Sequence, residues 1–152
     1  MTLDETDRRI LRVLQRRGRI SNADLSEEIN LSASACHRRV QRLEACGIIH
    51  EYVALLEPRK LGISTTVFVE ITLQSQSDEI FDAFEKAVSR IPDVQECHLM
   101  AGTADYILKI VADDTDDFAR IHRQHLARLP GVAQMQSSFA LRTVFKTSAL
   151  PI

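Results

Sequence analysis

The sequence predicts an α+β protein in which three short helices are followed by a β-α-β-β-α-β segment. Up to about residue 47, apolar residues recur at spacings of three and four, which is the helical period. After residue 63 they alternate with polar residues in several segments, which is the period of strands. Between these parts, Glu57-Pro58-Arg59-Lys60-Leu61-Gly62 contains both Pro and Gly. We expect the domain boundary here, because these two residues interrupt regular structure.

The composition is that of an ordinary globular protein, with 45% hydrophobic and 26% charged residues in a chain of 152. This length allows one large domain or two small ones. Residues 1–62 hold 11 Lys+Arg and 9 Asp+Glu, whereas residues 63–152 hold 8 and 12, so the two parts carry +2 and -4 and sum to the net charge of -2. A basic first part and an acidic second part favour a localised nucleic-acid-binding face over a uniformly basic surface.

The cellular location is predicted from what the sequence lacks. It has no apolar run long enough to span a membrane and no signal-peptide pattern. We therefore expect a cytoplasmic, nucleoid-associated protein. Its three cysteines, Cys36, Cys46 and Cys97, are odd in number and have no paired spacing, so we expect reduced and mostly buried thiols.

The first two helices are predicted from their capping residues. We expect the first over Leu3 to Gly18, with Asp4 as N-cap, Asp7 adding a second acid to the first turn and Gly18 ending the helix. Ser21 to Asp24 resembles a capping box and opens the second helix. The residues expected to be buried in these helices are Ile10, Leu11, Leu14, Leu25 and Ile29.

The third helix, predicted from Leu31 to Gly47, organises the first domain. Ser32 is a good N-cap, and Gly47 stands where a left-handed residue is favoured at the C-terminus. At 100° per residue the helix has two faces. The apolar face holds Ala33, Cys36, Val40 and Leu43; Ser34, Ala35, Arg38, Gln41 and Arg42 lie opposite, with Arg39 on the flank.

The second and third helices are joined by a tight turn at Asn30-Leu31, which is a helix-turn-helix arrangement. Small residues at the start of the exposed face allow approach to base edges in the major groove, and arginines further along reach phosphates. The residues predicted to bind DNA are Ser21, Ser32, Ser34, Ala35, Arg38, Arg39 and Arg42. A solvated, arginine-rich helix is the alternative interpretation of this helix taken alone.

The segment Ile48 to Leu56 is rich in β-formers and predicts either a wing or a linker strand. The predicted domains are therefore a (winged) helix-turn-helix over 1–50, a strand-like linker over 51–62 and a βαββαβ domain over 63–152. The elements expected in the last domain are strands at 66–73, Val94–Met100, Asp105–Ala112 and Val132–Phe145, and helices at Ser77–Arg90 and Thr115–Leu129.

A motif that occurs twice in the sequence supports the βαββαβ order. Arg90-Ile91-Pro92-Asp93-Val94 matches Arg128-Leu129-Pro130-Gly131-Val132, and both lie where a helix is expected to end and a strand to begin. Two such halves form a ferredoxin-like sheet with both helices on one face. Depending on register, the other face carries Phe68, Met100 or Phe139, and a second subunit is its simplest cover.

In this order of domains the chain resembles the Lrp/AsnC family of transcription regulators over nearly its whole length. The matching motifs are Leu3-Asp4 through Arg9-Ile10-Leu11, Gly18-Arg19-Ile20-Ser21, Leu31-Ser32, Arg39 to Glu44 with Gly47-Ile48-Ile49, and Gly102 with Asp105-Tyr106. Phe68 to Leu73 and Gln95 to Leu99 read like the leucine-responsive branch. The resemblance implies homodimers that assemble to tetramers, octamers or larger, DNA binding at repeated degenerate sites, and commonly an amino-acid effector at the interface between dimers.

The resemblance places the effector at the turn Gly102 to Asp105. An amino acid needs amides for its carboxylate and an acceptor for its ammonium group. We expect Asp105 to hold the ammonium group, and the Gly102 turn to offer amides at close range. The full predicted set is Met100, Ala101, Gly102, Thr103 and Asp105, with Ser137, Ser138, Phe139 and Ala140 shaping the side-chain pocket. The alternative is an ordinary hairpin turn, and Ala104 and Ser138 depart from residues common in relatives.

No catalytic residues, metal or cofactor other than this effector are predicted. His122 and His125 share a helix, but they lack the further converging ligands that zinc requires, and the adjacent Cys97 and His98 point to opposite faces of a strand. Two other functions stay open. Siroheme decarboxylases share this two-domain architecture, and a nucleoid-organising protein without an effector would bind DNA with little sequence preference.

Overall fold

The computed structural model describes residues 2–152, which divide into two compact units. The first unit comprises the chain up to Leu55 together with Phe145–Ile152, and the second comprises Leu56–Val144. Residues 145–152 were expected in the second domain, so their membership of the first unit is a difference from the sequence-based division. Among the described residues, no helix has the length and apolar character needed to cross a membrane.

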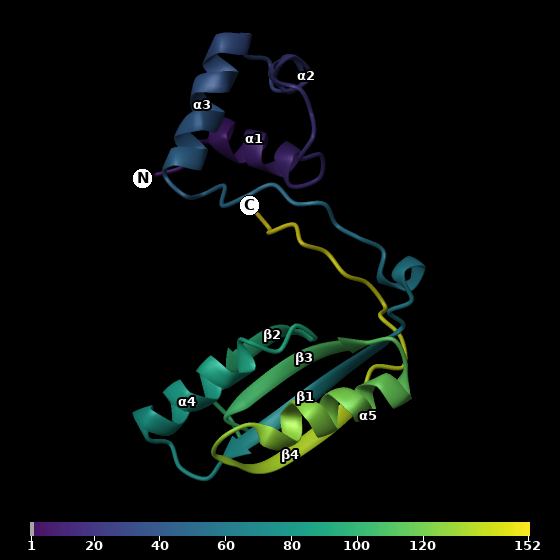
Figure 1. The fold of residues 1–152 in the computed structure, drawn as a ribbon. Helices are drawn as coiled ribbons and strands as arrows, with labels where there is room; N and C mark the ends of the chain where they lie inside the picture. Colours follow the sequence, from purple (N-terminus) through teal and green to yellow (C-terminus); the bar gives the residue numbers. More distant parts are fainter. Residues whose placement is uncertain (1) are drawn as a thin grey trace. The chain divides into compact units, whose positions relative to one another are not determined.

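The first unit is built from three helices, α1 (Glu5–Leu14), α2 (Asn22–Glu28) and α3 (Ala33–Ala45) (Figure 1). Each begins at the predicted cap: the side chains of Asp4, Ser21 and Ser32 accept from the amide three residues later. In α1 the cap is reciprocal, because the carboxylate of Asp7 also accepts from the amide of Asp4. The helices enclose a small core of Ile10, Leu11, Leu25, Ile29, Cys36 and Leu43.

The first helix ends earlier than predicted. It stops at Leu14 with Gln15 as its C-cap, and Gly18 does not have the left-handed backbone of a terminating glycine. A Cβ at Gly18 would lie 3.5 Å from Cδ1 of Tyr52, an ordinary contact distance. The described structure therefore requires a glycine at position 18 neither for termination of the helix nor for space beneath the Tyr52 ring.

The third helix has the predicted ends, and one of its faces needs correction. Gly47 has φ +70°, and the amide of Ile48 donates to the carbonyl of Leu43 at 3.0 Å, as in a Schellman motif. Cys36 and Leu43 are fully buried, but Ala33 is exposed, because it lies in the first turn before the helix reaches the core. Cys46 is exposed too, which corrects the expectation of mostly buried thiols at that position.

The predicted wing or linker strand does not form. Within the part of the chain that the structure describes, residues 46–57 contain no strand, and Val53, Leu55 and Leu56 are exposed. A β-propensity alone cannot make a strand, because a strand requires a partner for its backbone groups. A short 3-10 helix, η1 (Pro58–Leu61), follows and ends at Gly62, whose φ is +85°.

The second unit has the predicted βαββαβ order and ferredoxin-like topology (Figure 1). Its elements are β1 (Thr65–Leu73), α4 (Asp78–Val88), β2 (Val94–Leu99), β3 (Tyr106–Ala112), α5 (Thr115–Gln124), the 3-10 helix η2 (Leu126–Arg128) and β4 (Val132–Phe139). The strands lie in the order β2-β3-β1-β4, and all neighbours are antiparallel. The last predicted helix is divided at His125, and the last strand ends at Phe139 rather than Phe145.

The register separates the residues expected on the open face of the sheet. Val67, like the other odd-numbered apolar residues of β1, is buried with α4 and α5, so Phe68 lies on the opposite, open face and is 39% exposed. Phe139 pairs with Val67 and therefore lies on the helix side, where its ring meets that of Phe118 at 5.2 Å between centroids. Met100 lies just beyond β2. Phe68 therefore lies on the open face, and Phe139 does not.

Candidate DNA-contacting helix and ligand-binding turn

The outer face of α3 presents the residues predicted to reach base edges. Ser34 and Arg38 are exposed, four residues apart and therefore on one side of the helix, and Ala35 beside them is half-buried. Arg38, Arg39 and Arg42 line a shallow hollow of about 280 Å³. Guanidinium groups recognise phosphate oxygens through paired hydrogen bonds, so a hollow lined by three of them suits an anion.

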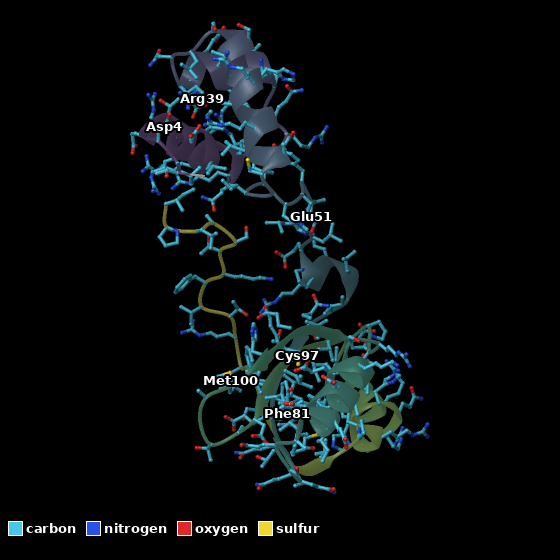
Figure 2. The ribbon with its side chains drawn as sticks, turned by 90° about the vertical axis from the view of Figure 1, so that its left-hand side faces the viewer. Asp4, Arg39, Glu51, Phe81, Cys97 and Met100 are labelled. Atoms are coloured by element: carbon cyan, nitrogen blue, oxygen red, sulfur yellow. The ribbon has the colours of Figure 1, made fainter. Side chains whose placement is uncertain are left out.

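The two flanking arginines are held by a buried carboxylate. Nη1 of Arg39 donates to Asp4 Oδ2 and to Asp7 Oδ1 at 2.8 Å each, and Nη2 of Arg42 donates to Asp7 Oδ1 and Oδ2 at 2.8 and 2.7 Å. Figure 2 shows Asp4 and Arg39 side by side. The side chain of Asp7 is 1% exposed, whereas those of Arg39 and Arg42 are 28% and 48% exposed. Asp7 therefore fixes one edge of α3 to α1.

This cluster also sets the charge of the hollow. The hydrogen bond from the Asp7 amide, followed by that from Arg39, lowers the pKa of Asp4. Hydrogen bonds to Asp4 and then Asp7 raise the pKa of Arg39. Three arginines set against the two carboxylates leave a net charge of +1. Arg38 has no part in these pairs, so it is the arginine of the three with its charge fully available to a ligand.

The start of α3 is tied to α2 by a contact that sequence reasoning did not anticipate. Nδ2 of Asn22 donates to the carbonyl of Ala33 at 2.9 Å, and Asn30 turns the chain between the helices with φ +56°. The hydroxyls of Ser21 and Ser32 accept from the first-turn amides at 3.0 and 3.3 Å. A hydroxyl that accepts still has a hydrogen to donate, so Ser21 can contact a phosphate, and the Ser32 hydroxyl can do so where its 3.3 Å contact with the Ser34 hydroxyl leaves it as the acceptor.

The turn predicted to bind an effector, residues 100–105, is anchored by Asp105. The Asp105 side chain accepts from the amide of Leu73 at 2.7 Å and from Nε2 of Gln76 at 2.9 Å, and the residue is only 8% exposed. Its own amide donates to the carbonyl of Ile71. Asp105 therefore fastens the end of β1 to the turn. It does not present the open carboxylate that the sequence led us to expect.

The rest of the turn is open. Ala101, Gly102 and Thr103 are exposed, and Met100 is 46% exposed. Gly102 does not have a left-handed backbone, and a Cβ added to it would meet no heavy atom of the described residues within 4 Å. The described part of the chain therefore does not itself require glycine at position 102.

The second group of predicted effector residues lies elsewhere on the sheet. Ser137 and Phe139 pair with Val69 and Val67, while the turn adjoins Ile71 through Asp105. Val67 and Ile71 are four positions apart along β1, which is roughly 14 Å at about 3.4 Å per residue. One chain therefore does not bring the turn and the segment 137–140 together into a single pocket.

A separate hollow of 360 Å³ lies between α4 and β2. Its lining residues are Glu85, Val88, Ser89, Val94, Gln95, Glu96, Cys97, Leu99 and Tyr106. The hydroxyl of Tyr106 donates to Glu85 at 2.6 Å across it, and burial, followed by this hydrogen bond, raises the pKa of Tyr106. None of the predicted effector residues lines this hollow.

Comparison with known proteins identifies both units. Residues 3–50 match the family model for a winged helix-turn-helix DNA-binding domain, and residues 66–150 match that for the Lrp/AsnC ligand binding domain. The leucine-responsive regulatory proteins of Klebsiella pneumoniae and Escherichia coli strain K12 are each 42% identical over 150 residues, which cover 99% of this chain and 92% of theirs.

Solved structures agree with these matches. A transcriptional regulator from Neisseria meningitidis in complex with L-Met superposes with a TM-score of 0.94 at 36% identity, covering 99% of this chain and 97% of its own. An AsnC family transcriptional regulator from Agrobacterium tumefaciens gives 0.94 and 36%, covering 98% and 97%. All of these relatives are named as regulators, which favours regulation over the decarboxylase alternative. The chain belongs to the Lrp/AsnC family of transcriptional regulators.

Proposed function

We propose that α3 enters the major groove of duplex DNA and reads base edges through Ser34, Ala35 and Arg38. The observation that carries this proposal is the single exposed face on which Ser34 and Arg38 stand, with small residues before the long cation. An Arg side chain can donate two hydrogen bonds to guanine in the groove, and a small side chain lets the helix approach. Of the three α3 arginines, Arg38 is the one that is outside the Asp4 and Asp7 pairs.

Phosphate contacts are proposed for the residues around this face. Ser21 and Ser32 lie at helix N-termini, where amides and hydroxyls favour anions. Arg39 and Arg42 keep exposed donors beside their pairs with Asp7, so they can bridge the carboxylate and a phosphate. A DNA-binding regulator works where the chromosome is, so we propose a cytoplasmic, nucleoid-associated protein.

Replacing arginines one at a time separates these two roles. Arg38→Ala is expected to reduce discrimination between operator and random duplex by about 1–3 kcal/mol, because a base contact is lost. Arg42→Ala is expected to weaken all duplexes alike and to reduce the salt slope by about one, because a phosphate contact is lost. Fluorescence anisotropy over a range of salt concentrations measures both quantities, and Arg19→Ala, an exposed arginine outside α3, is the control. Unchanged binding by both α3 variants contradicts the assignment.

We also propose that the second unit binds an amino acid at a site completed by a second copy of the chain. The support is the separation of the open turn at Gly102 from Ser137–Ala140, which one chain leaves apart. The similar Neisseria regulator was solved with L-Met, which favours this ligand class. The exposed Phe68 on the open sheet face gives a second reason for homodimers, and tetramers or larger assemblies would bring further copies of the turn together.

The experiment is anisotropy with the DNA upstream of this protein's own gene, with random duplex as competitor. It is run alone, with L-methionine, and with a mixture of the twenty amino acids. Selective binding that shifts with an amino acid is expected, because both domains of a ligand-responsive regulator are present. Selective binding without a shift contradicts the amino-acid effector. Binding without selectivity favours the nucleoid-organising alternative, since affinity then comes from phosphates alone.

A further inference from the structure

The last residues of the described chain are bound to α1 of the first unit. The side-chain amide of Gln15 contacts both main-chain groups of Leu150: Nε2 donates to the carbonyl at 3.2 Å, and Oε1 accepts from the amide. Two residues later, Nε of Arg12 donates to the main-chain oxygen of Ile152 at 2.6 Å. Figure 1 shows this end of the chain, labelled C, near the N-terminal helices. The side chains of the first unit thus contact the main chain of the segment, so these hydrogen bonds do not depend on the side chain at position 150.

One apolar side chain adds to these hydrogen bonds. Ile152 is half-buried and packs against the core of the first unit, whereas Leu150 is 69% exposed. Arg12 is itself oriented by a 2.7 Å ion pair with Glu5 on the same helix. Residues 149–152 thus bind a surface that offers two oriented polar side chains and an apolar contact. Together these three contacts fix the position of the segment on the first unit.

Binding of this segment also gives the chain a second connection between the two units. The chain passes from the first unit to the second at Leu55–Leu56 and returns at Val144–Phe145. The amide of Ala140, just after β4, still donates to Thr66 of β1, so the returning segment starts directly from the sheet. If residues 149–152 were free, only the linker before Leu56 would join the units. With them bound, the second unit is attached at both of its ends, which restricts the orientations that the first unit can sample.

We propose that residues 149–152 form a latch, a segment that binds the Gln15 and Arg12 face of α1 and restrains the DNA-binding unit through this second attachment. The latch goes beyond the proposed DNA and effector contacts and does not depend on them. A regulator must carry a change in its ligand-binding unit to its DNA-binding unit, and this segment begins at the strand that holds Ser137–Phe139.

The test measures binding of the latch and its consequence separately in the full chain by NMR. The amides of residues 150 and 152 are hydrogen-bonded in the latched state. We expect Gln15→Ala and Ile152→Asp to increase their exchange rates about tenfold or more, because each removes one part of the contact. Arg16→Ala, a neighbouring exposed residue whose side chain makes none of these hydrogen bonds, and Leu141→Ala, which is 100% exposed in the returning segment, should leave both rates unchanged.

The second measurement is the ¹⁵N relaxation of the first unit in the same samples. The latch variants should shorten the rotational correlation time of the first unit relative to that of the second, and the control variants should not. Rapid exchange of Leu150 in the unmodified protein overturns the latch. Increased exchange with an unchanged correlation time overturns the restraint. Neither measurement uses DNA or an amino acid, so failure here is distinct from failure of the proposed function.

Discussion

Asp7→Ala is expected to destabilise the DNA-binding unit by about 3 kcal/mol, the largest effect of any single change in that unit's polar residues. The Asp7 carboxylate is buried, caps α1 and accepts hydrogen bonds from both Arg39 and Arg42. Removing one member of a buried ion cluster leaves the others without compensation, which typically costs about 3–5 kcal/mol. We take the lower end of this range because both arginines are partly exposed and can turn toward water.

The measurement must be specific to the first unit, because a two-unit chain need not unfold in one step. Hydrogen exchange of the α3 amides in increasing urea provides it. Asp7→Asn keeps the shape and one acceptor but not the charge, and we expect about half the effect. Asp78→Ala, an exposed acid in the second unit, is the control. If Asp7→Ala is as stable as the control, the cluster does not hold α3 in place.

The same variant bears on DNA recognition. If the cluster fixes α3 against α1, its loss should lower the discrimination between operator and random duplex at temperatures where the unit remains folded, because the face with Ser34 and Arg38 is then held less precisely. Releasing the two arginines also raises the net charge of the hollow by one, so affinity for random duplex should rise at low salt. Positioning and simple stability are thus separable, because a merely unstable variant would bind all duplexes less.

Local regularities account for the elements that the sequence predicted. The caps at Asp4, Ser21 and Ser32 and the left-handed Gly47 depend on residues within a few positions of one another, and each is found as expected. The alternation in β1 likewise predicts which side chains are buried, because side chains on a strand alternate between two faces. These features need no knowledge of the rest of the chain.

Two of the features that the sequence did not reveal join distant segments. Asp7 meets Arg42 35 positions later, and Gln15 meets Leu150 across 135 positions. The second contact is made to the main chain of Leu150, so the residue type at position 150 could not have predicted it. The expected strand after α3 failed for a related reason: its β-formers are present, but strand formation depends on a partner that local sequence cannot supply.

Asp105→Ala is expected to destabilise the ligand-binding unit by about 3 kcal/mol. The change leaves the buried amide of Leu73 without its acceptor and releases Gln76, and hydrogen bonds to a charged group contribute about 1.5–3 kcal/mol each. The turn at Gly102 is then held to the end of β1 by main-chain contacts alone, so we expect any response to an amino acid to be lost together with stability. Hydrogen exchange of the β1 and β3 amides in urea measures the first effect, and anisotropy with L-methionine measures the second.

Asp105→Asn decides between an anchor and a direct ligand contact. The asparagine oxygen can still accept from the Leu73 amide, and Gln76 can reverse its amide to accept from the new NH₂ group. An anchor therefore survives this change with a small loss of stability and a retained amino-acid response. If the Asp105 carboxylate instead pairs with the ammonium group of the effector, Asp105→Asn abolishes the amino-acid response, because the negative charge is lost. If Asp105→Asn has normal stability but no amino-acid response, Asp105 contacts the ligand directly. We expect instead a small loss of stability with a retained response, because the carboxylate is buried and already bonded within the chain.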